Sequence, residues 1–144
     1  MAQDRIPPDD RPDFRLDHVM IRVQDLDRAL GFYVGLLGMK ILRQADYPGG
    51  RFTNIFLGFP GQDGQTALEL TWNWDRATPY PAGENFGHLA LMVPDLVAAM
   101  DWLERRGVTI RTPPRRMAHG TRMIGFVLDP EGIPIEMMEP LDQA

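Results

Sequence analysis

Two histidines and two glutamates stand at matching positions in the two halves of this 144-residue chain. His18 and His88 begin the apolar stretches HVMIRV and HLALMV, 70 positions apart. Glu69 and Glu136 each lie between two apolar residues, in LEL and in IEM. Two imidazoles and two carboxylates form an N₂O₂ donor set that suits Zn, Ni, Co, Mn or Fe. A buried carboxylate pair also needs a cation between its members. The sequence therefore predicts a metal site to which both halves contribute.

The absence of cysteine excludes several other kinds of site and scaffold. It excludes disulfide scaffolds, thiolate nucleophiles, iron–sulfur clusters and cysteine zinc sites. The third histidine, His119, lies between Ala118 and Gly120, and we expect it in a mobile loop and not as a ligand. A net charge of −5 argues against a general nucleic-acid or anionic-membrane partner. With no apolar run of membrane-spanning length and no signal peptide, we expect a cytoplasmic protein.

The elements that position these side chains occur twice. Each half is predicted to form a βαβββ module: a strand, a helix and three further strands. Asp25 and Asp95 occupy the N-cap positions of the two helices, and Gly38 and Gly107 end them. The predicted strands are 18–23, 39–43, 53–57 and 67–72 in the first half, and 88–93, 108–111, 123–128 and 134–138 in the second. Pro134 is expected at a strand start or on an edge strand.

Alternation along these strands assigns the histidines and glutamates to the polar faces of the sheets. His18, Met20 and Arg22 share one face of the first strand, while Val19, Ile21 and Val23 face the opposite way. Glu69 and Asn73 likewise share one face of the fourth strand. Each histidine and glutamate therefore lies opposite the apolar face that should meet the helices.

The length of the chain suits one α+β domain with its own hydrophobic core. Residues 1–15 are rich in proline and charge, and we expect a flexible N-terminal tail there. Residues 16–140 are expected to form a single domain of two modules, about 16–75 and 86–140.

Four segments resemble the metal-bearing segments of the glyoxalase I family, within the vicinal oxygen chelate superfamily. They are HVMIRV, LELTWNW, GHLALMV and DPEGIPIEMMEP, and the resemblance covers about residues 16–140. It implies the glyoxalase/bleomycin-resistance/dihydroxybiphenyl dioxygenase-like fold, in which paired βαβββ modules form curled mixed sheets. The family's four metal ligands would be His18, Glu69, His88 and Glu136.

The resemblance also implies which metal is bound and how many chains form the site. Glu69 and His88 are only 19 positions apart, which is similar to the short bacterial form of the family that favours Ni or Co over Zn. The family forms homodimers in which each metal would take His18 and Glu69 from one chain and His88 and Glu136 from the other.

The activity that the resemblance implies is isomerisation of the hemithioacetal of glutathione and methylglyoxal to S-lactoylglutathione through an enediolate. This reaction detoxifies methylglyoxal. A divalent metal would polarise the substrate oxygens, and a carboxylate would move a proton between neighbouring carbons. By resemblance this base is Glu136, and Glu69 is its counterpart for the other enantiomer.

Three further residues are implied in substrate binding. Arg22 and Asn73 match family positions that contact glutathione, and Arg111 lies near a basic position that binds its glycyl carboxylate. An arginine can hold such a carboxylate through two parallel hydrogen bonds. Glu84 and the segment 113–120 depart from the family pattern, which leaves the identity of the thiol open.

Other members of the superfamily supply the alternatives. An epimerase acting on a coenzyme A thioester typically has Gln where Glu69 stands. An extradiol dioxygenase would need iron and only three protein ligands. A non-catalytic binding or resistance protein of this fold usually lacks the metal ligands, all four of which are present here.

Overall fold

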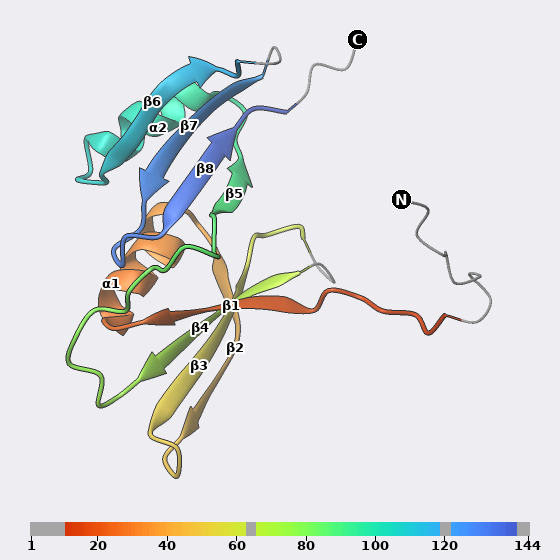
Figure 1. Ribbon diagram of the computed structural model, residues 1–144, viewed down its shortest axis with the longest axis vertical. Coiled ribbons are helices and arrows are strands. Elements are labelled where there is room, and N and C mark those ends of the chain that lie inside the picture. The colour runs from red at the N-terminus through yellow and green to blue at the C-terminus, as the bar shows by residue number, and fades with distance from the viewer. Residues whose placement is uncertain (1–10, 63–65, 119–121, 141–144) are drawn as a thin grey trace.

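The computed structural model describes residues 11–62, 66–118 and 122–140. Most of the predicted tail and His119 therefore lie outside the described residues. The chain forms two four-stranded mixed sheets, one from each half (Figure 1). The strand orders are β1-β4-β3-β2 and β5-β8-β7-β6, so the second half repeats the topology of the first. In each sheet the first strand runs parallel to its neighbour and the other pairings are antiparallel. The paired βαβββ prediction is confirmed.

The elements follow the predicted order closely. Those of the first half are β1 (His18–Val23), α1 (Leu26–Leu30), η2 (Gly31–Leu36), β2 (Lys40–Tyr47), β3 (Phe52–Gly58) and β4 (Ala67–Asn73). Those of the second half are β5 (Leu89–Met92), α2 (Leu96–Glu104), β6 (Ile110–Arg116), β7 (Met123–Leu128) and β8 (Pro134–Met138). No helix within the described residues is long and apolar enough to cross a membrane.

The predicted helix signals are confirmed. Asp25 and Asp95 each accept a hydrogen bond, at 3.0 Å, from the backbone N–H three residues further on. Gly38 and Gly107 have φ angles of 80° and 87°, in the left-handed region that favours glycine after a helix. These local signals start and stop the two helices at equivalent points of the repeat.

The first helix differs from the single α-helix that the sequence predicts. After α1 it continues as the π-helical segment η2, in which the Leu37 N–H donates to the Phe32 carbonyl at 2.9 Å. The wider turn accompanies the burial of two adjacent aromatic side chains, Phe32 and Tyr33. Helical periodicity alone does not anticipate two neighbouring residues facing the core.

The strand predicted at 108–111 lies further along the chain in the structure. Strand β6 continues beyond Arg111 to Arg116 and includes Pro113 and Pro114. These prolines are tolerated because β6 lies at the edge of its sheet and its register shifts between Thr112 and Arg115. Pro134 begins β8, as predicted.

A buried hydrogen-bond network joins the two modules. The Tyr33 hydroxyl donates to the Asp129 carboxylate at 2.7 Å, and this carboxylate also accepts the backbone N–H groups of Glu131 and Ile133. Burial raises the pKa of Asp129, and burial together with this carboxylate raises the pKa of Tyr33. The Glu131 carboxylate in turn accepts the N–H of Gln24, just before α1, at 2.7 Å. The turn after β7 thus fixes the start of the first helix.

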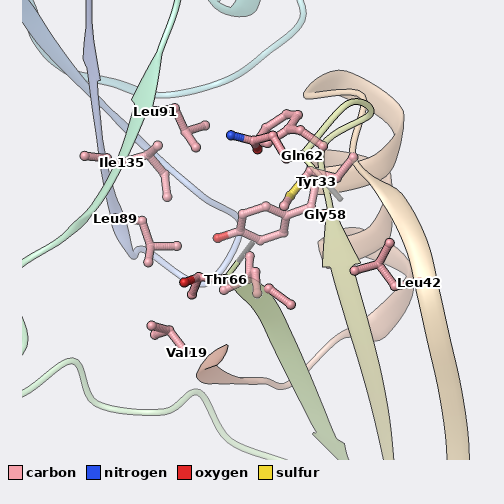
Figure 2. A pocket seen from close by; sticks show the side chains of 14 residues that line it. Val19, Tyr33, Leu42, Gly58, Gln62, Thr66, Leu89, Leu91 and Ile135 are labelled. Carbon is pink, nitrogen blue, oxygen red and sulfur yellow. The ribbon is translucent and has the colours of Figure 1, made fainter. Parts of the chain in front are cut away.

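The apolar faces of the two sheets meet beside an apolar cavity of about 310 Å³. Figure 2 shows Leu89, Leu91 and Ile135 of the second sheet on one side of it, and Tyr33 of the first module on the other. These strand residues alternate with those of the polar faces. The cavity therefore belongs to the core between the modules, and the predicted site residues lie on the other side of each sheet.

Candidate metal centre

The first histidine–glutamate pair lies on the polar face of the first sheet. His18 begins β1, and Glu69 lies in the middle of the neighbouring strand β4, where its residue is only 7% exposed. The His18 Nε2 and Glu69 Oε2 atoms are 2.8 Å apart. The parallel register pairs Glu69 with Met20, two residues beyond the histidine, so both side chains lie on the same face.

The second sheet repeats this arrangement. His88 stands immediately before β5, and its Nε2 lies 2.7 Å from Oε2 of Glu136 in β8. Glu136 pairs with Ala90, again two residues beyond the histidine. The internal repeat therefore extends from the sequence to the register of the strands and the contact between the side chains.

Each histidine ring also packs against a phenylalanine of the third strand of its module. Phe56 and Phe126 meet the rings of His18 and His88 edge-on, with centroid separations of 5.2 and 5.3 Å. Each phenylalanine is paired across strands with the glutamate of its module. The sequence reasoning did not assign these aromatic residues to the site. Their recurrence 70 positions apart was the available signal.

The chemistry of the two pairs fits a divalent metal ion. Imidazole nitrogen and carboxylate oxygen are ligands of first-row divalent metals. Among the described residues, the Glu69 side chain has no polar partner other than His18, although it is largely buried. A carboxylate in such a position is stabilised by a cation.

One chain does not bring all four residues together. No group of three or more His, Asp or Glu side chains with metal-binding spacing occurs among the described residues. The structure thus joins His18 with Glu69 and His88 with Glu136, but leaves the two pairs on separate sheets. Each pair brings together one imidazole and one carboxylate.

Arg22 and Asn73 line one polar hollow at the ends of β1 and β4, together with Tyr80. Asn73 donates from its side-chain amide to the Tyr80 hydroxyl at 2.9 Å. In the same hollow Arg51 forms an ion pair with Asp75 and lowers the pKa of that carboxyl. Arg22, in contrast, has no hydrogen bond or ion pair with the described part of the chain. Its guanidinium is therefore available to an anionic group.

Arg111 lies in a larger cleft of about 1110 Å³ between the modules. Arg22, Arg115 and His88 line the same cleft, so Arg22 borders both hollows. The structure thus brings cations from both halves to the vicinity of one candidate metal ligand. A cleft with several arginines suits a substrate that carries carboxylates.

Tyr80 is a candidate site residue that the sequence reasoning missed. It lies in the connection between the modules, where no periodic pattern predicts an element. Its hydroxyl contacts Asn73, and the guanidinium of Arg76 lies 4.2 Å from its ring centroid. Only the folded chain brings this segment beside the ends of β1 and β4.

Comparison with known proteins agrees with this geometry. The family model described as the Glyoxalase/Bleomycin resistance protein/Dioxygenase superfamily matches residues 15–137. The chain belongs to this superfamily. The lactoylglutathione lyase of Neisseria meningitidis is 44% identical over 125 residues, which cover 87% of this chain and 90% of that protein. The probable lactoylglutathione lyase of Synechocystis is 43% identical over 122 residues, covering 85% and 92%.

Solved structures of this superfamily share the fold. Glyoxalase I from Zea mays is similar with a TM-score of 0.79 and 35% identity over 88% of this chain, which spans 47% of the maize chain. The trypanothione-dependent glyoxalase I of Leishmania major gives a TM-score of 0.76 and 38% identity, with 88% and 87% covered. The superfamily fold expected from the four segments is confirmed.

Proposed function

We propose that this chain catalyses the glyoxalase I reaction, in which the hemithioacetal of glutathione and methylglyoxal is isomerised to S-lactoylglutathione. The observation that carries the proposal is the pair of equivalent histidine–glutamate contacts, His18–Glu69 and His88–Glu136, between strand pairs of equivalent register. Relatives named lactoylglutathione lyase at 43–44% identity over most of the chain support it. The role in the cell would be detoxification of methylglyoxal in the cytoplasm.

The four side chains would hold one divalent metal, through the Nε2 atoms of His18 and His88 and the carboxylates of Glu69 and Glu136. When bound, the metal would act as a Lewis acid toward the two neighbouring substrate oxygens and so make the adjacent C–H bond more acidic. The 19-position interval between Glu69 and His88 resembles the short bacterial form and favours Ni or Co over Zn.

A carboxylate of the chain carries out the proton transfer. Glu136 removes the proton from the carbon that carries sulfur and the hydroxyl group, and the electron pair becomes the carbon–carbon double bond of an enediolate. The same carboxylate returns the proton to the neighbouring carbon, while the hydroxyl proton moves to the other oxygen. The product is an isomer of the substrate, and no oxidant or reductant is consumed. Glu69 would serve the other enantiomer.

The complete site would require two copies of the chain. In each dimer site His18 and Glu69 would come from one chain, and His88 and Glu136 from its partner. The separation of the two pairs within the described part of one chain supports this arrangement. The interface between copies would then be part of the catalytic site.

Glutathione carries two carboxylates and one ammonium group. Arg22 and Asn73 would contact glutathione from the polar hollow at the ends of β1 and β4. Arg111, in the larger cleft, would bind its glycyl carboxylate. Among the described residues the Arg22 guanidinium has no hydrogen bond or ion pair, which supports this role, because a guanidinium forms strong charge-assisted hydrogen bonds with a carboxylate.

The test is metal removal followed by reconstitution. The protein is stripped with a chelator and reloaded with Ni, Co or Zn. Formation of the thioester from methylglyoxal and glutathione is then followed by absorbance. We expect activity to be lost on stripping and to return more fully with Ni or Co than with Zn. Failure of the protein to take up any of these metals would contradict the proposal and favour a non-catalytic binding protein. Metal uptake without turnover of the glutathione adduct would contradict the proposed substrate.

A further inference from the structure

The geometry points to Asp17 as a positioning residue for His18. The Asp17 Oδ2 atom lies 2.7 Å from Nδ1 of the His18 ring, while Nε2 of the same ring faces Glu69. The ring therefore lies between two carboxylates, one at each nitrogen. The inference rests on the proposed function, because it takes His18 as a metal ligand.

The backbone around Asp17 fixes where its carboxylate can lie. Asp17 precedes β1, and its carbonyl accepts the N–H of Ala67 at the start of β4, at 3.1 Å. The pairing of β1 with β4 thus includes Asp17, the residue that precedes the histidine. Phe56 supports the ring edge-on with a centroid separation of 5.2 Å. Phe56 and Glu69 set the position of the His18 ring, and in that position its Nδ1 faces Asp17.

Among the described residues, the second module has no such contact. The residue before His88 is Gly87, so no carboxylate precedes this histidine. The two histidine–glutamate pairs otherwise share the same strand register. Their Nε2–Oε2 distances are 2.8 and 2.7 Å, and the ring centroids of histidine and phenylalanine are 5.2 and 5.3 Å apart. Asp17 therefore breaks the internal symmetry of the candidate centre.

The physical consequence follows from the two nitrogens of the ring. A proton held on Nδ1 by a carboxylate leaves the Nε2 lone pair free for a metal and fixes the orientation of the ring. Loss of such an outer contact typically lowers metal affinity about 10- to 100-fold. Asp17 is mostly exposed, so we expect its removal to fall at the low end of that range.

The first measurement is metal affinity of the purified protein, by competition with a chromogenic chelator. Asp17→Ala should bind Ni or Co about tenfold more weakly than the wild type. Asp17→Asn, which keeps an acceptor oxygen, should recover part of the loss. The matched control is Asp13→Ala, which removes an exposed carboxylate of the same segment that contacts Arg15 and not the histidine. It should leave the affinity unchanged.

The second measurement uses the metal-free protein and does not depend on the proposed reaction. Long-range ¹H–¹⁵N spectra should show a proton on Nδ1 of His18 in the wild type and its loss in Asp17→Ala. A reciprocal variant, Gly87→Asp, should give His88 the same Nδ1 proton and tighter metal binding. An added Cβ at Gly87 meets no atom within 4 Å, so the position can accept a side chain.

Equal metal affinities for Asp17→Ala and the wild type, or an unchanged Nδ1 signal, would overturn the inference. A wild type that binds no metal would instead contradict the proposed function, and the spectra of the metal-free protein would still decide whether Asp17 holds the His18 ring.

Discussion

At the scale of single residues, the two halves of the candidate centre use the same donors in different surroundings. Glu69 and Glu136 each contact a histidine and pair with a phenylalanine. Asp17 adds a second carboxylate to His18 alone. The two halves therefore differ at the histidine, while the contacts of the two glutamates are alike.

Glu136→Gln should abolish turnover, because an amide cannot take up the substrate proton. We expect kcat to fall by about 10²- to 10⁴-fold, the range typical of a lost general base. The protein should keep its fold and its assembly, which circular dichroism and size-exclusion chromatography would check.

The matched control for this variant is Glu104→Gln, which makes the same change at an exposed position of α2. It should retain wild-type kcat. Full activity in Glu136→Gln would refute the role assigned to that carboxylate.

Tyr80→Phe should weaken substrate binding without slowing the chemical step. The hydroxyl accepts a hydrogen bond from Asn73, and its loss leaves that amide less well oriented. A lost hydrogen bond of about 1 kcal/mol corresponds to a KM for the hemithioacetal about fivefold higher, with kcat nearly unchanged. Steady-state kinetics would separate the two constants. A fall in kcat at constant KM would contradict this role.

At the scale of secondary-structure elements, the turn between β7 and β8 determines how the modules meet. Asp129 accepts hydrogen bonds from Tyr33 of the first module and from its own turn. Glu131 accepts the N–H groups of Gln24 and Asp25 at the start of α1. Both contacts are between elements about 100 positions apart, and they hold the two sheets in a fixed relation.

Tyr33→Phe should lower the free energy of unfolding by about 1–3 kcal/mol, because the buried Asp129 carboxylate loses a hydrogen-bond donor. Urea denaturation would measure the change. The control is Tyr47→Phe, at a tyrosine that is 46% exposed, and it should have little effect. Equal stabilities of the two variants would contradict the importance of the Tyr33–Asp129 contact.

The buried Asp129 should also make stability depend on pH. Burial raises its pKa, so the folded state binds the proton more tightly than the unfolded chain. Its contribution is therefore most favourable below the unfolded value of about 3.9 and declines as the pH rises through the raised folded value.

Asp129→Asn removes this titration while keeping an acceptor for the turn. The free energy of unfolding of the wild type relative to Asp129→Asn should fall as the pH rises from about 4, the ordinary carboxyl value, toward neutrality. Denaturant unfolding of both proteins at a series of pH values would check this. A difference that does not change with pH would contradict the pKa shift.

At the scale of the whole molecule, the arrangement of the sheets leaves each polar face with one histidine–glutamate pair. The apolar faces are used within the chain, where they form the core beside the cavity between the modules. The polar faces are thus left to meet a ligand or a second copy. A symmetric dimer would use both faces twice and produce two equivalent sites.

Mixing two inactive variants tests this arrangement directly. His18→Ala and His88→Ala should each abolish activity as separate homodimers. If each site draws on two chains, unfolding and refolding an equal mixture forms heterodimers with one intact site, and about a quarter of wild-type activity returns. If each site belongs to one chain, every site keeps one defect and no activity returns.

Much of the fold could be predicted because the sequence signals of the βαβββ module occur twice in the chain. The N-caps Asp25 and Asp95, the glycines after the helices and the alternation in the strands are local signals, and each repeats at an equivalent position. The π-helical segment and the proline-containing end of β6 were not predicted. Both depend on tertiary context: the burial of Phe32 with Tyr33, and the edge position of β6.

The sequence by itself determined the donor types, their order and the faces on which they lie, because residue identity and strand alternation are local properties. Only the tertiary structure decided which donors meet. Strand register brought His18 to Glu69 and His88 to Glu136, and the packing of the apolar faces kept the two pairs apart. It also placed Tyr80 beside Asn73 and Asp17 beside the His18 ring. Contacts between distant segments depend on the geometry of the whole chain, which no local pattern contains.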